Sequence, residues 1–292
     1  MKILITGGNG VLGQYLNMAL SKRFKLLTTF HSNTGNCIDH NSIQIDITNR
    51  KNISSIINLY RPEIVIHSAA IANPMVSGPV NSGVVYNTNV TATQNIAELC
   101  DKFSAKLIYI STDLVYAGYR GSMLKEDAKL IPASLYAETK LMGEIKIQET
   151  FDNYLILRTA LLYGFGIGNK KTHFHQMYEN FENNKPVKLF YDQYRTPLSF
   201  FEAGRIINKL TGSELKGEII NLGGKERVSR LEMGEVLCNL AGFDKNLIEK
   251  VSMGDLPDYP AVEDVSMDTS KLQSYGIKLK SIEESVKEII TS

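Results

Sequence analysis

The chain has 292 residues, of which 43% are hydrophobic and 22% are charged, and this composition excludes intrinsic disorder, collagen and coiled coil. Lysine and arginine together number 32 and aspartate and glutamate 31, so the net charge of +1 gives no general attraction for nucleic acid or for an anionic membrane. No apolar run approaches the ~20 residues of a membrane span. The length suits one large α/β unit or two small domains.

The spacing of the cysteines and the sequence at the N-terminus both favour a cytoplasmic protein. The cysteine spacing also argues against a metal site. Cys37, Cys100 and Cys238 are far apart and form no CxxC motif, so neither a disulfide framework nor a zinc site is expected. The segment Met1–Gly7 reaches glycine too soon for a signal peptide. His173 and His175 can share one face of a strand, but no third metal ligand is nearby in the sequence.

Short apolar strands alternate with helical patterns over the first 165 residues. The predicted strands are Lys2–Thr6, Lys25–Thr29, Ile43–Asp46, Ile64–His67, Lys106–Ser111 and Tyr154–Thr159. The predicted helices are Val11–Lys22, Asn49–Tyr60, Val84–Phe103 and Ser134–Thr150. This alternation indicates βαβ units and a parallel sheet covered on both faces, which is the doubly wound, Rossmann-type α/β architecture. Ligands bind such sheets at the carboxyl ends of the strands, so chemistry is sought in the residues that follow each strand.

The regular alternation stops after Gly164. Two further strand-like segments follow, Val187–Phe190 and Glu218–Asn221, and the acidic stretch Asp255–Asp268 is more typical of a solvated loop than of a magnesium site. We expect residues 1–165 to form a dinucleotide-binding domain, to which elements around 187–222 return. Residues 166–292 are expected to form mainly a smaller, substrate-binding cap.

A glycine-rich turn lies between the first strand and the first helix, with Gly7, Gly10 and Gly13 as its spaced glycines. Gly7 permits a tight turn, Gly10 lets a pyrophosphate approach the backbone, and Gly13 lets the helix pack closely on the strand. The helix N-terminus then offers unpaired N–H groups to the phosphates. The position of the motif, after a strand and at the start of a helix, predicts a dinucleotide site.

The segment after the second strand bears on the choice between NADP and NAD. An acidic residue there binds the 2′-hydroxyl of NAD and repels the 2′-phosphate of NADP, and this chain has none. His31 and Ser32 can donate to a 2′-phosphate, so we expect NADP(H) to be favoured and NAD(H) to bind as well. Asp46 and Ile47 are placed to meet the adenine. The alternative role of Asp46 is to cap the next helix, for which Thr48 is the better candidate.

A tyrosine and a lysine near the start of a predicted helix form a candidate acid–base pair. The spacing of four residues puts Tyr136 and Lys140 on one helix face. A phenol has a pKa near ~10, and a neighbouring ammonium lowers it, so the pair can exchange a proton with a carbonyl or alcohol oxygen. Ser111 and Thr112 end the fifth strand, where a hydroxyl can donate to the same oxygen.

These motifs occur in the order found in the extended short-chain dehydrogenases/reductases, which the first 165 residues resemble. The segments are TGGNGVLG (6–13), IDIT (45–48), HSAA (67–70), YNTNV (86–90), STDLVY (111–116), YAETK (136–140) and LRTALLYG (157–164). Within that superfamily the chain is most similar to the dTDP-4-dehydrorhamnose reductases and related sugar-nucleotide reductases. YDQYRTP (191–197) and VSMDTSKLQSYGI (265–277) extend this similarity into the C-terminal third.

The resemblance implies an NAD(P)H-dependent reductase of a 4-keto-6-deoxy sugar nucleotide, with Thr112, Tyr136 and Lys140 as its catalytic triad. The cofactor contacts that it implies are Gly10, Val11, Leu12, Asp46, Ile47, Ala69, Ala70, Tyr136 and Lys140. Asn89 would lie near the cofactor or support the loop after the fourth strand. Thr112 and Tyr136 would face the sugar, and Asp113, Gln193 and Arg195 are candidates for sugar or diphosphate contacts.

The chain also departs from the pattern of the family. Leu161 stands where an aromatic residue is frequent, Arg195 where a small residue is usual, and Leu198 where threonine usually follows the proline. The loop Ala72–Gly83 is atypical, with two prolines and no charge, and the chain has no tryptophan. These changes concern the part of the site that chooses the substrate.

Two other functions compete with the reductase. The dehydratases of this superfamily carry Asp-Glu after the threonine, whereas here Asp113 is followed by Leu114, which argues against dehydration but leaves a sugar-nucleotide epimerase as an alternative. The second alternative is a non-catalytic regulatory subunit that resembles the one partnering methionine adenosyltransferase. A nucleotide-sugar ligand, no nucleic-acid or membrane partner, and a homodimer are compatible with the resemblance.

Overall fold

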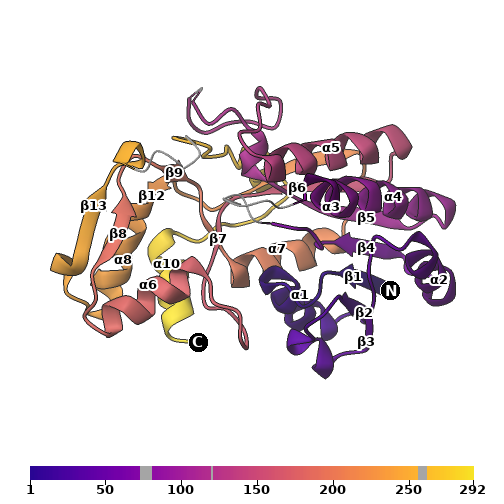
Figure 1. The fold of residues 1–292 in the computed structure, drawn as a ribbon, viewed down its shortest axis with the longest axis horizontal. Coiled ribbons are helices and arrows are strands. Elements are labelled where there is room, and N and C mark those ends of the chain that lie inside the picture. Colours follow the sequence, from indigo (N-terminus) through magenta and orange to yellow (C-terminus); the bar gives the residue numbers. More distant parts are fainter. Residues whose placement is uncertain (73–80, 120, 256–261) are drawn as a thin grey trace. The chain divides into compact units, whose positions relative to one another are not determined.

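A computed structural model describes residues 1–72, 81–119, 121–255 and 262–292. Part of the atypical loop 72–83 and part of the acidic stretch 255–268 therefore lie outside the described residues. The chain divides into two units, each built from three stretches (Figure 1). The first unit comprises Met1–Thr112, Ser134–Leu157 and Gly204–Ile220, and the second comprises Asp113–Ala133, Arg158–Ala203 and Asn221–Ser292.

A seven-stranded sheet in the order β11-β6-β5-β4-β1-β2-β3 organises the first unit. Its strands are β1 (Lys2–Thr6), β2 (Lys25–Phe30), β3 (Ser42–Gln44), β4 (Ile64–His67), β5 (Lys106–Thr112), β6 (Tyr154–Thr159) and β11 (Glu218–Leu222). The pairs from β3 to β5 are parallel, with Leu4 opposite both Leu27 and Val65. The order reverses between β1 and β4, and this confirms the predicted doubly wound parallel sheet.

Helices cover both faces of this sheet, as its continuously apolar strands require. Helices α2 (Arg50–Tyr60), α4 (Ala92–Lys102) and α5 (Leu135–Thr150) lie on one face, and α1 (Val11–Ser21) and α7 (Phe200–Thr211) lie side by side on the other (Figure 1). Asn208 of α7 donates to the carbonyl of Ala19 in α1 at 2.7 Å. The core between the strands and the first group of helices contains Leu4, Val65, Leu107, Ile53, Ile57, Ile96 and Ile147, all buried.

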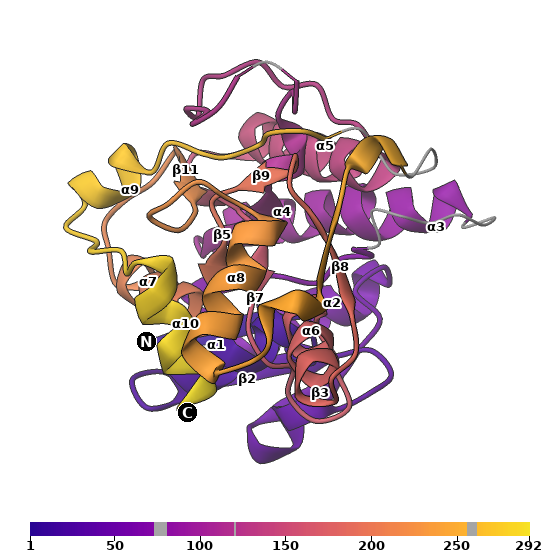
Figure 2. The same ribbon diagram turned by 90° about the vertical axis from the view of Figure 1, so that its left-hand side faces the viewer.

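The second unit contains three pairs of short strands and its own hydrophobic core. Some of these strands are labelled in Figure 2. The pairs are β7 (Leu162–Tyr163) with β10 (Leu198–Ser199), β8 (Val187–Phe190) with β13 (Ile248–Val251), and β9 (Tyr194–Arg195) with β12 (Val228–Ser229). Its helices are α6 (His173–Glu182), α8 (Arg230–Ala241), α9 (Ser270–Ser274) and α10 (Ile282–Ile290). Capping boxes begin α8, through Ser229 and Glu232, and α10, through Ser281 and Glu284.

Short helical turns complete both units. They are η1 (Gly35–Asp39), α3 (Ser82–Tyr86), η2 (Asn87–Thr91), η3 (Asp113–Val115), η4 (Lys245–Leu247) and η5 (Met253–Asp255). The predicted helix Val84–Phe103 is thus interrupted, because η2 has π-helical hydrogen bonding between α3 and α4. His173 and His175, which could share one face only on a strand, instead belong to helix α6, which Thr172 caps by accepting from the N–H of His175.

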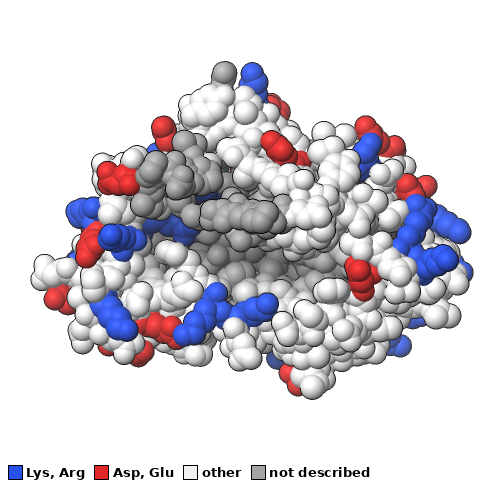
Figure 3. All heavy atoms as spheres, viewed as in Figure 1, with Lys and Arg blue, Asp and Glu red and all other residues white. Residues whose placement is uncertain are grey.

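The charged side chains at the surface and the state of the cysteines can be compared with the expectations from the sequence. On the face shown in Figure 3, basic and acidic side chains are interspersed. Cys37, Cys100 and Cys238 are free and buried. In the part of the chain that the structure describes, no helix has the length and apolarity needed to cross a bilayer. The same residues contain no cluster of histidine, cysteine, aspartate or glutamate suited to a metal ion.

Candidate active site

The turn between β1 and α1 requires glycine for two different reasons. Gly7 has a φ of +73°, and a Cβ there would lie 2.7 Å from the backbone nitrogen of Ala69, in the loop after β4. A Cβ on Gly13 would lie 2.8 Å from the Cα of Gly8, so this glycine lets α1 pack against the turn itself rather than against the strand. At Gly10, in contrast, the nearest protein atom to a Cβ is the carbonyl oxygen of Gly7 at 3.3 Å. A Cβ at Gly10 is therefore tight but much less obstructed by protein atoms than one at Gly7 or Gly13.

The N-terminus of α1 is open to an anion. Gly10 is its N-cap and supplies no side-chain cap, so among the described residues the first N–H groups of the helix, beginning with the half-buried Val11 and Leu12, have no side-chain acceptor at this end. These groups and the helix dipole favour a phosphate at this position. A dinucleotide pyrophosphate fits the turn for this reason.

Two buried amides that the sequence analysis missed hold the turn in place. Asn17 donates to the carbonyl of Gly8 at 3.1 Å, and Gln14 donates to the carbonyl of Asn9 at 3.3 Å. Both also bind Asn36 in η1. Asn17 donates to the side-chain oxygen of Asn36 at 2.9 Å, and Gln14 accepts from the backbone N–H of Asn36 at 2.9 Å. Their spacing of three residues on α1, facing inward, is the signal that could have identified them.

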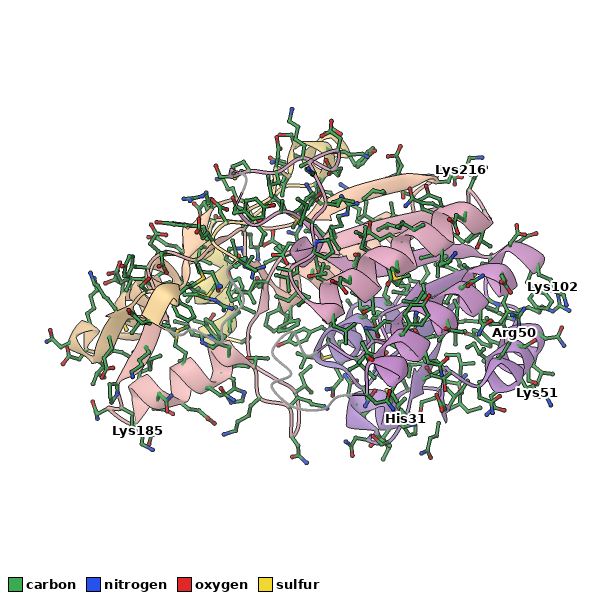
Figure 4. The ribbon with its side chains drawn as sticks, turned by 45° about the horizontal axis from the view of Figure 1, so that its top comes forward. His31, Arg50, Lys51, Lys102, Lys185 and Lys216 are labelled. Carbon is green, nitrogen blue, oxygen red and sulfur yellow. The ribbon has the colours of Figure 1, made fainter. Side chains whose placement is uncertain are left out.

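At the adenosine end of the predicted site, His31 and Ser32 are exposed after β2, and Figure 4 shows His31 at the surface of the first unit. Asp46 is also exposed, and its Oδ1 accepts from the backbone N–H and the hydroxyl of Thr48 at 2.9 and 2.7 Å. These hydrogen bonds lower the pKa of Asp46, and His31 is close enough to contribute. Ile47 beside it is buried.

The cap of α2 differs from both sequence-based candidates. Neither Asp46 nor Thr48 caps the helix: the side chain of Asn49 does so by accepting from the backbone N–H groups of Lys51 and Asn52 at 3.1 and 3.2 Å. Asn49 lies immediately before the first helical residue, which is the position where an N-cap oxygen reaches those groups. Asp46 instead shapes the turn before the helix.

Asn89 supports the loop that follows β4. Its amide accepts from the N–H of Ile71 at 2.9 Å and donates to the carbonyl of Ile71 at 3.1 Å and to the hydroxyl of Thr139 at 3.0 Å. The π-helical turn η2 carries Asn89 and thus links the loop containing Ala69 and Ala70, both half-buried, to helix α5.

The proposed catalytic side chains come from strand β5 and helix α5. Ser134 caps α5 by accepting from the N–H of Ala137 at 3.3 Å, which fixes the start of the helix at Leu135, one residue before Tyr136. Tyr136 is half-buried and Lys140 is 2% exposed. The ammonium of Lys140 lies over the ring of Tyr109 in β5, 3.8 Å from its centre. Thr112, at the carboxyl end of the same strand, is buried.

Electrostatics at this site centre on Lys140. Burial lowers the pKa of Lys140 to about 7, and the negative charge of Glu144 opposes that shift. Among the described residues, no hydrogen-bond acceptor contacts its ammonium nitrogen. A buried lysine with open N–H donors suits a ligand that accepts hydrogen bonds, such as a ribose diol.

A neutral histidine lies beneath the site. Burial lowers the pKa of His67 to about 3, and Lys140 contributes to the shift. The hydroxyl of Thr93 donates to the carbonyl of Asn89 at 2.8 Å, so its oxygen accepts from Nε2 of His67 at 2.9 Å. Nδ1 then accepts from Thr6 at 2.6 Å. This chain of hydrogen bonds joins the start of the glycine turn to Asn89 of η2, whose side chain in turn donates to Thr139 of α5.

Of the five predicted substrate residues, Thr112 and Tyr136 belong to the first unit, and Asp113, Gln193 and Arg195 belong to the second. Arg195 donates from Nη1 to Asp113 at 2.9 Å, and both side chains are buried. Its Nε is buried without an acceptor among the described residues. Gln193 is fully buried, where it donates to the sulfur of Met253 at 3.2 Å and accepts from Nε of Arg230 at 3.4 Å.

A cleft of about 480 Å³ opens in the same unit. Its lining includes the aromatic rings of Tyr119, Tyr191 and Tyr194. Arg227 lies over the ring of Tyr194, 3.5 Å from its centre, and donates to Asp264 at 2.7 Å. The sequence alone does not reveal this cleft, because its lining residues come from four separate segments of the chain.

Three comparisons with known proteins bear on this arrangement. A family model described as RmlD substrate binding domain matches residues 1–292. A probable low-salt glycan biosynthesis reductase of Haloferax volcanii is 29% identical over 267 residues, which cover 89% of this chain and 87% of that protein. The dTDP-4-dehydrorhamnose reductase of Aggregatibacter actinomycetemcomitans is 25% identical over 309 aligned positions, which cover 99% and 98% of the two chains.

A solved structure shares the fold over nearly its whole length. The dTDP-4-dehydrorhamnose reductase of Bacillus anthracis, in complex with NADP, superposes with a TM-score of 0.87 at 23% identity, covering 99% of this chain and 98% of that one. The fold described above is therefore the fold of a protein whose structure holds a dinucleotide.

Proposed function

Because the chain belongs to the RmlD substrate binding domain family, we propose that it is an NAD(P)H-dependent reductase of a 4-keto-6-deoxy sugar nucleotide, similar to dTDP-4-dehydrorhamnose reductase. One observation carries the proposal. The half-buried Tyr136 precedes the buried Lys140 by one helical turn, and no group in the described part of the chain accepts a hydrogen bond from that lysine. The same unit holds the glycine turn before α1, where Gly10 supplies no side-chain cap. An acid–base pair and a dinucleotide cradle are thus present together.

The proposed reaction reduces a ketone to an alcohol. When bound, the reduced cofactor supplies the hydride that adds to C4 of the sugar. Negative charge then develops on the carbonyl oxygen, to which the hydroxyl of Thr112 donates a hydrogen bond. Tyr136 gives that oxygen its phenolic proton, and the ammonium of Lys140 stabilises the phenolate that remains. The same ammonium donates to the nicotinamide ribose.

NADP(H) is the favoured cofactor in this proposal, and NAD(H) is expected to bind as well. The support is the absence of a carboxylate in the segment after β2, where the exposed His31 and Ser32 can instead meet a 2′-phosphate. The related reductase of Bacillus anthracis was solved with NADP.

Asp113, Gln193 and Arg195 stay the proposed contacts of the sugar or diphosphate. The buried Arg195 retains an Nε donor without an acceptor among the described residues, while Asp113 compensates its charge. This combination suits a hydroxyl or carbonyl of the sugar better than a diphosphate. Gln193 is wholly buried, so we propose that it acts by orienting Arg230, from whose Nε it accepts.

We also propose that the enzyme works in the cytoplasm. The support is the state of Cys37, Cys100 and Cys238, which are all free and buried, as is typical of proteins in reducing compartments. Cell fractionation with an antibody against the chain would test this location.

The test of the function is oxidation of NADPH by the purified protein with 4-keto-6-deoxy sugars linked to dTDP, UDP, GDP and CDP. We expect one nucleotide series to be turned over, and the same series to raise the unfolding midpoint most, since the shift follows RT ln(1 + [L]/Kd). No oxidation with any of them, together with co-purification of a partner enzyme, would instead support the regulatory subunit. Interconversion of sugar epimers without net cofactor oxidation would support the epimerase.

A further inference from the structure

Glu144 is a buried carboxylate for which the proposed reaction has no role. It lies four residues after Lys140 and eight after Tyr136 on α5, so all three project from one side of the helix. Its side chain is 0% exposed. Ser111 of β5 donates to Oε1 of Glu144 at 2.5 Å. A buried charge is costly unless it is hydrogen-bonded and compensated, so a carboxylate at this position calls for an explanation.

The surroundings of Lys140 provide that explanation. Its ammonium contacts the ring of Tyr109, and in the described part of the chain it forms neither a hydrogen bond nor a contact ion pair. A contact salt bridge would occupy the N–H donors that a ribose needs. The bond from Ser111 holds the carboxylate of Glu144 against β5, where it acts on the ammonium through space.

We propose that Glu144, held by Ser111, is a positioning residue that keeps Lys140 in its ammonium form without occupying the N–H donors of that ammonium. The inference rests on the proposed function, because it explains how the lysine of that reaction stays charged in a buried site.

The other groups that face Lys140 carry no negative charge at neutral pH. From β4, His67 is neutral because burial lowers its pKa to about 3. From β5, Tyr109 is neutral because burial raises its pKa well above the usual value. Tyr136, on α5 itself, is the phenol that gives the proton. Glu144 is therefore the anion that offsets the burial of Lys140, whose pKa stands at about 7 with Glu144 in place.

Glu144→Gln tests the proposal. Glutamine keeps the volume and an oxygen that can accept from Ser111, and removes only the charge. Activity should fall at high pH where Lys140 loses its proton, and in the variant this decline should move to lower pH by about one unit. The expected signature in kcat/KM is a loss of about tenfold at pH 8 that shrinks to about twofold at pH 6. A loss of equal size at both pH values overturns the proposal.

Two further variants complete the test. Glu149→Gln removes an exposed carboxylate from the same helix, one that pairs with Lys146 at 2.8 Å, and should leave the profile unchanged. Glu144→Asp keeps the charge but moves it one methylene away, so the decline should shift in the same direction and by less. If Glu144→Gln does not fold, the aspartate variant decides: an unshifted profile overturns the proposal.

Dinucleotide binding separates this inference from the proposed function. The dissociation constant of NADH, measured between pH 6 and 9 without any sugar, should rise at lower pH in Glu144→Gln than in the wild type. A wild type that turns over no 4-keto sugar refutes the proposed reaction, and the binding series still tests Glu144. A wild type that turns over the sugar, with identical binding series in the two proteins, refutes the role of Glu144 alone.

Discussion

At the scale of single residues, the site depends on one buried lysine more than on any other group. Lys140 is 2% exposed, and burial brings its pKa down to about 7, so the fraction of ammonium changes steeply in the physiological range. The sequence predicted the pair of Tyr136 and Lys140 from their spacing. It did not predict Tyr109 beneath the ammonium, because that contact joins a strand to a helix about thirty residues later.

The lysine predicts a pH dependence of cofactor binding. The ordinary pKa of 10.5 is lowered to about 7 in the protein, so above pH 7 most of the lysine is neutral. A bound ribose that accepts hydrogen bonds from the ammonium favours the protonated form of Lys140. The protein therefore takes up a proton when the cofactor binds above pH 7. The affinity for NADH should fall as the pH rises from 7 towards 9. In Lys140→Met, calorimetric titration should show weaker binding and a nearly flat dependence. An equally steep dependence in that variant would show that another group is responsible.

The cofactor preference predicts a second change. Thr29, at the end of β2, is buried, so an added carboxylate belongs one or two residues later, at the exposed His31. His31→Asp should shift the ratio of the dissociation constants for NADPH and NADH towards NADH by about tenfold or more, because the carboxylate accepts from the 2′-hydroxyl and repels the 2′-phosphate. Fluorescence titration of both cofactors measures this ratio. A wild type that already prefers NADH tenfold would contradict the premise.

At the scale of elements, the site is an arrangement of strand ends and helix starts. The sequence pattern located β1, β5 and α5 to within a few residues. The two strands are runs of mainly apolar residues, and the helix begins after an N-cap serine. Periodicity could not show the π-helical turn η2 inside the predicted helix 84–103. Each hydrogen-bonded ring of a π-helical turn contains one residue more than a ring of an α-helix. Here the turn carries Asn89, which binds the backbone of Ile71, a contact between segments that are distant in the sequence.

The glycine turn supplies the prediction at this scale. Gly10→Val should abolish dinucleotide binding, because the branched side chain occupies the space that a pyrophosphate needs beside the helix N-terminus. The carbonyl oxygen of Gly7, 3.3 Å from a Cβ, has to move by only a few tenths of an ångström, so the unfolding midpoint should stay within about 4 °C of the wild type. Gly254→Val is the matched control: a Cβ there meets its nearest atom at 3.4 Å, far along the chain from the turn. Normal cofactor affinity in Gly10→Val would show that the turn is purely structural.

At the scale of the whole molecule, the two units are assembled from interleaved stretches. The alternation of strands and helices predicted the sheet. Elements near 187–222 were expected to return to it: β11 is part of that sheet, whereas β8 pairs with β13 in the second unit. It gave no sign that Asp113–Ala133 belongs with the second unit. The bonds responsible, from Arg158 to Tyr116 and from Asn221 to Glu126, join residues far apart in the chain, and local pattern carries no information about them.

Comparison of the wild type with Tyr136→Phe in NADPH-dependent reduction of a 4-keto-6-deoxy sugar nucleotide tests the central claim most directly. General acid catalysis contributes about 10²–10⁴-fold, so kcat should fall by that factor in the variant. The affinity for NADPH should change little, because the phenolic hydroxyl acts on the reacting oxygen. A wild type that reduces the sugar while Tyr136→Phe does so at the same rate would contradict the account.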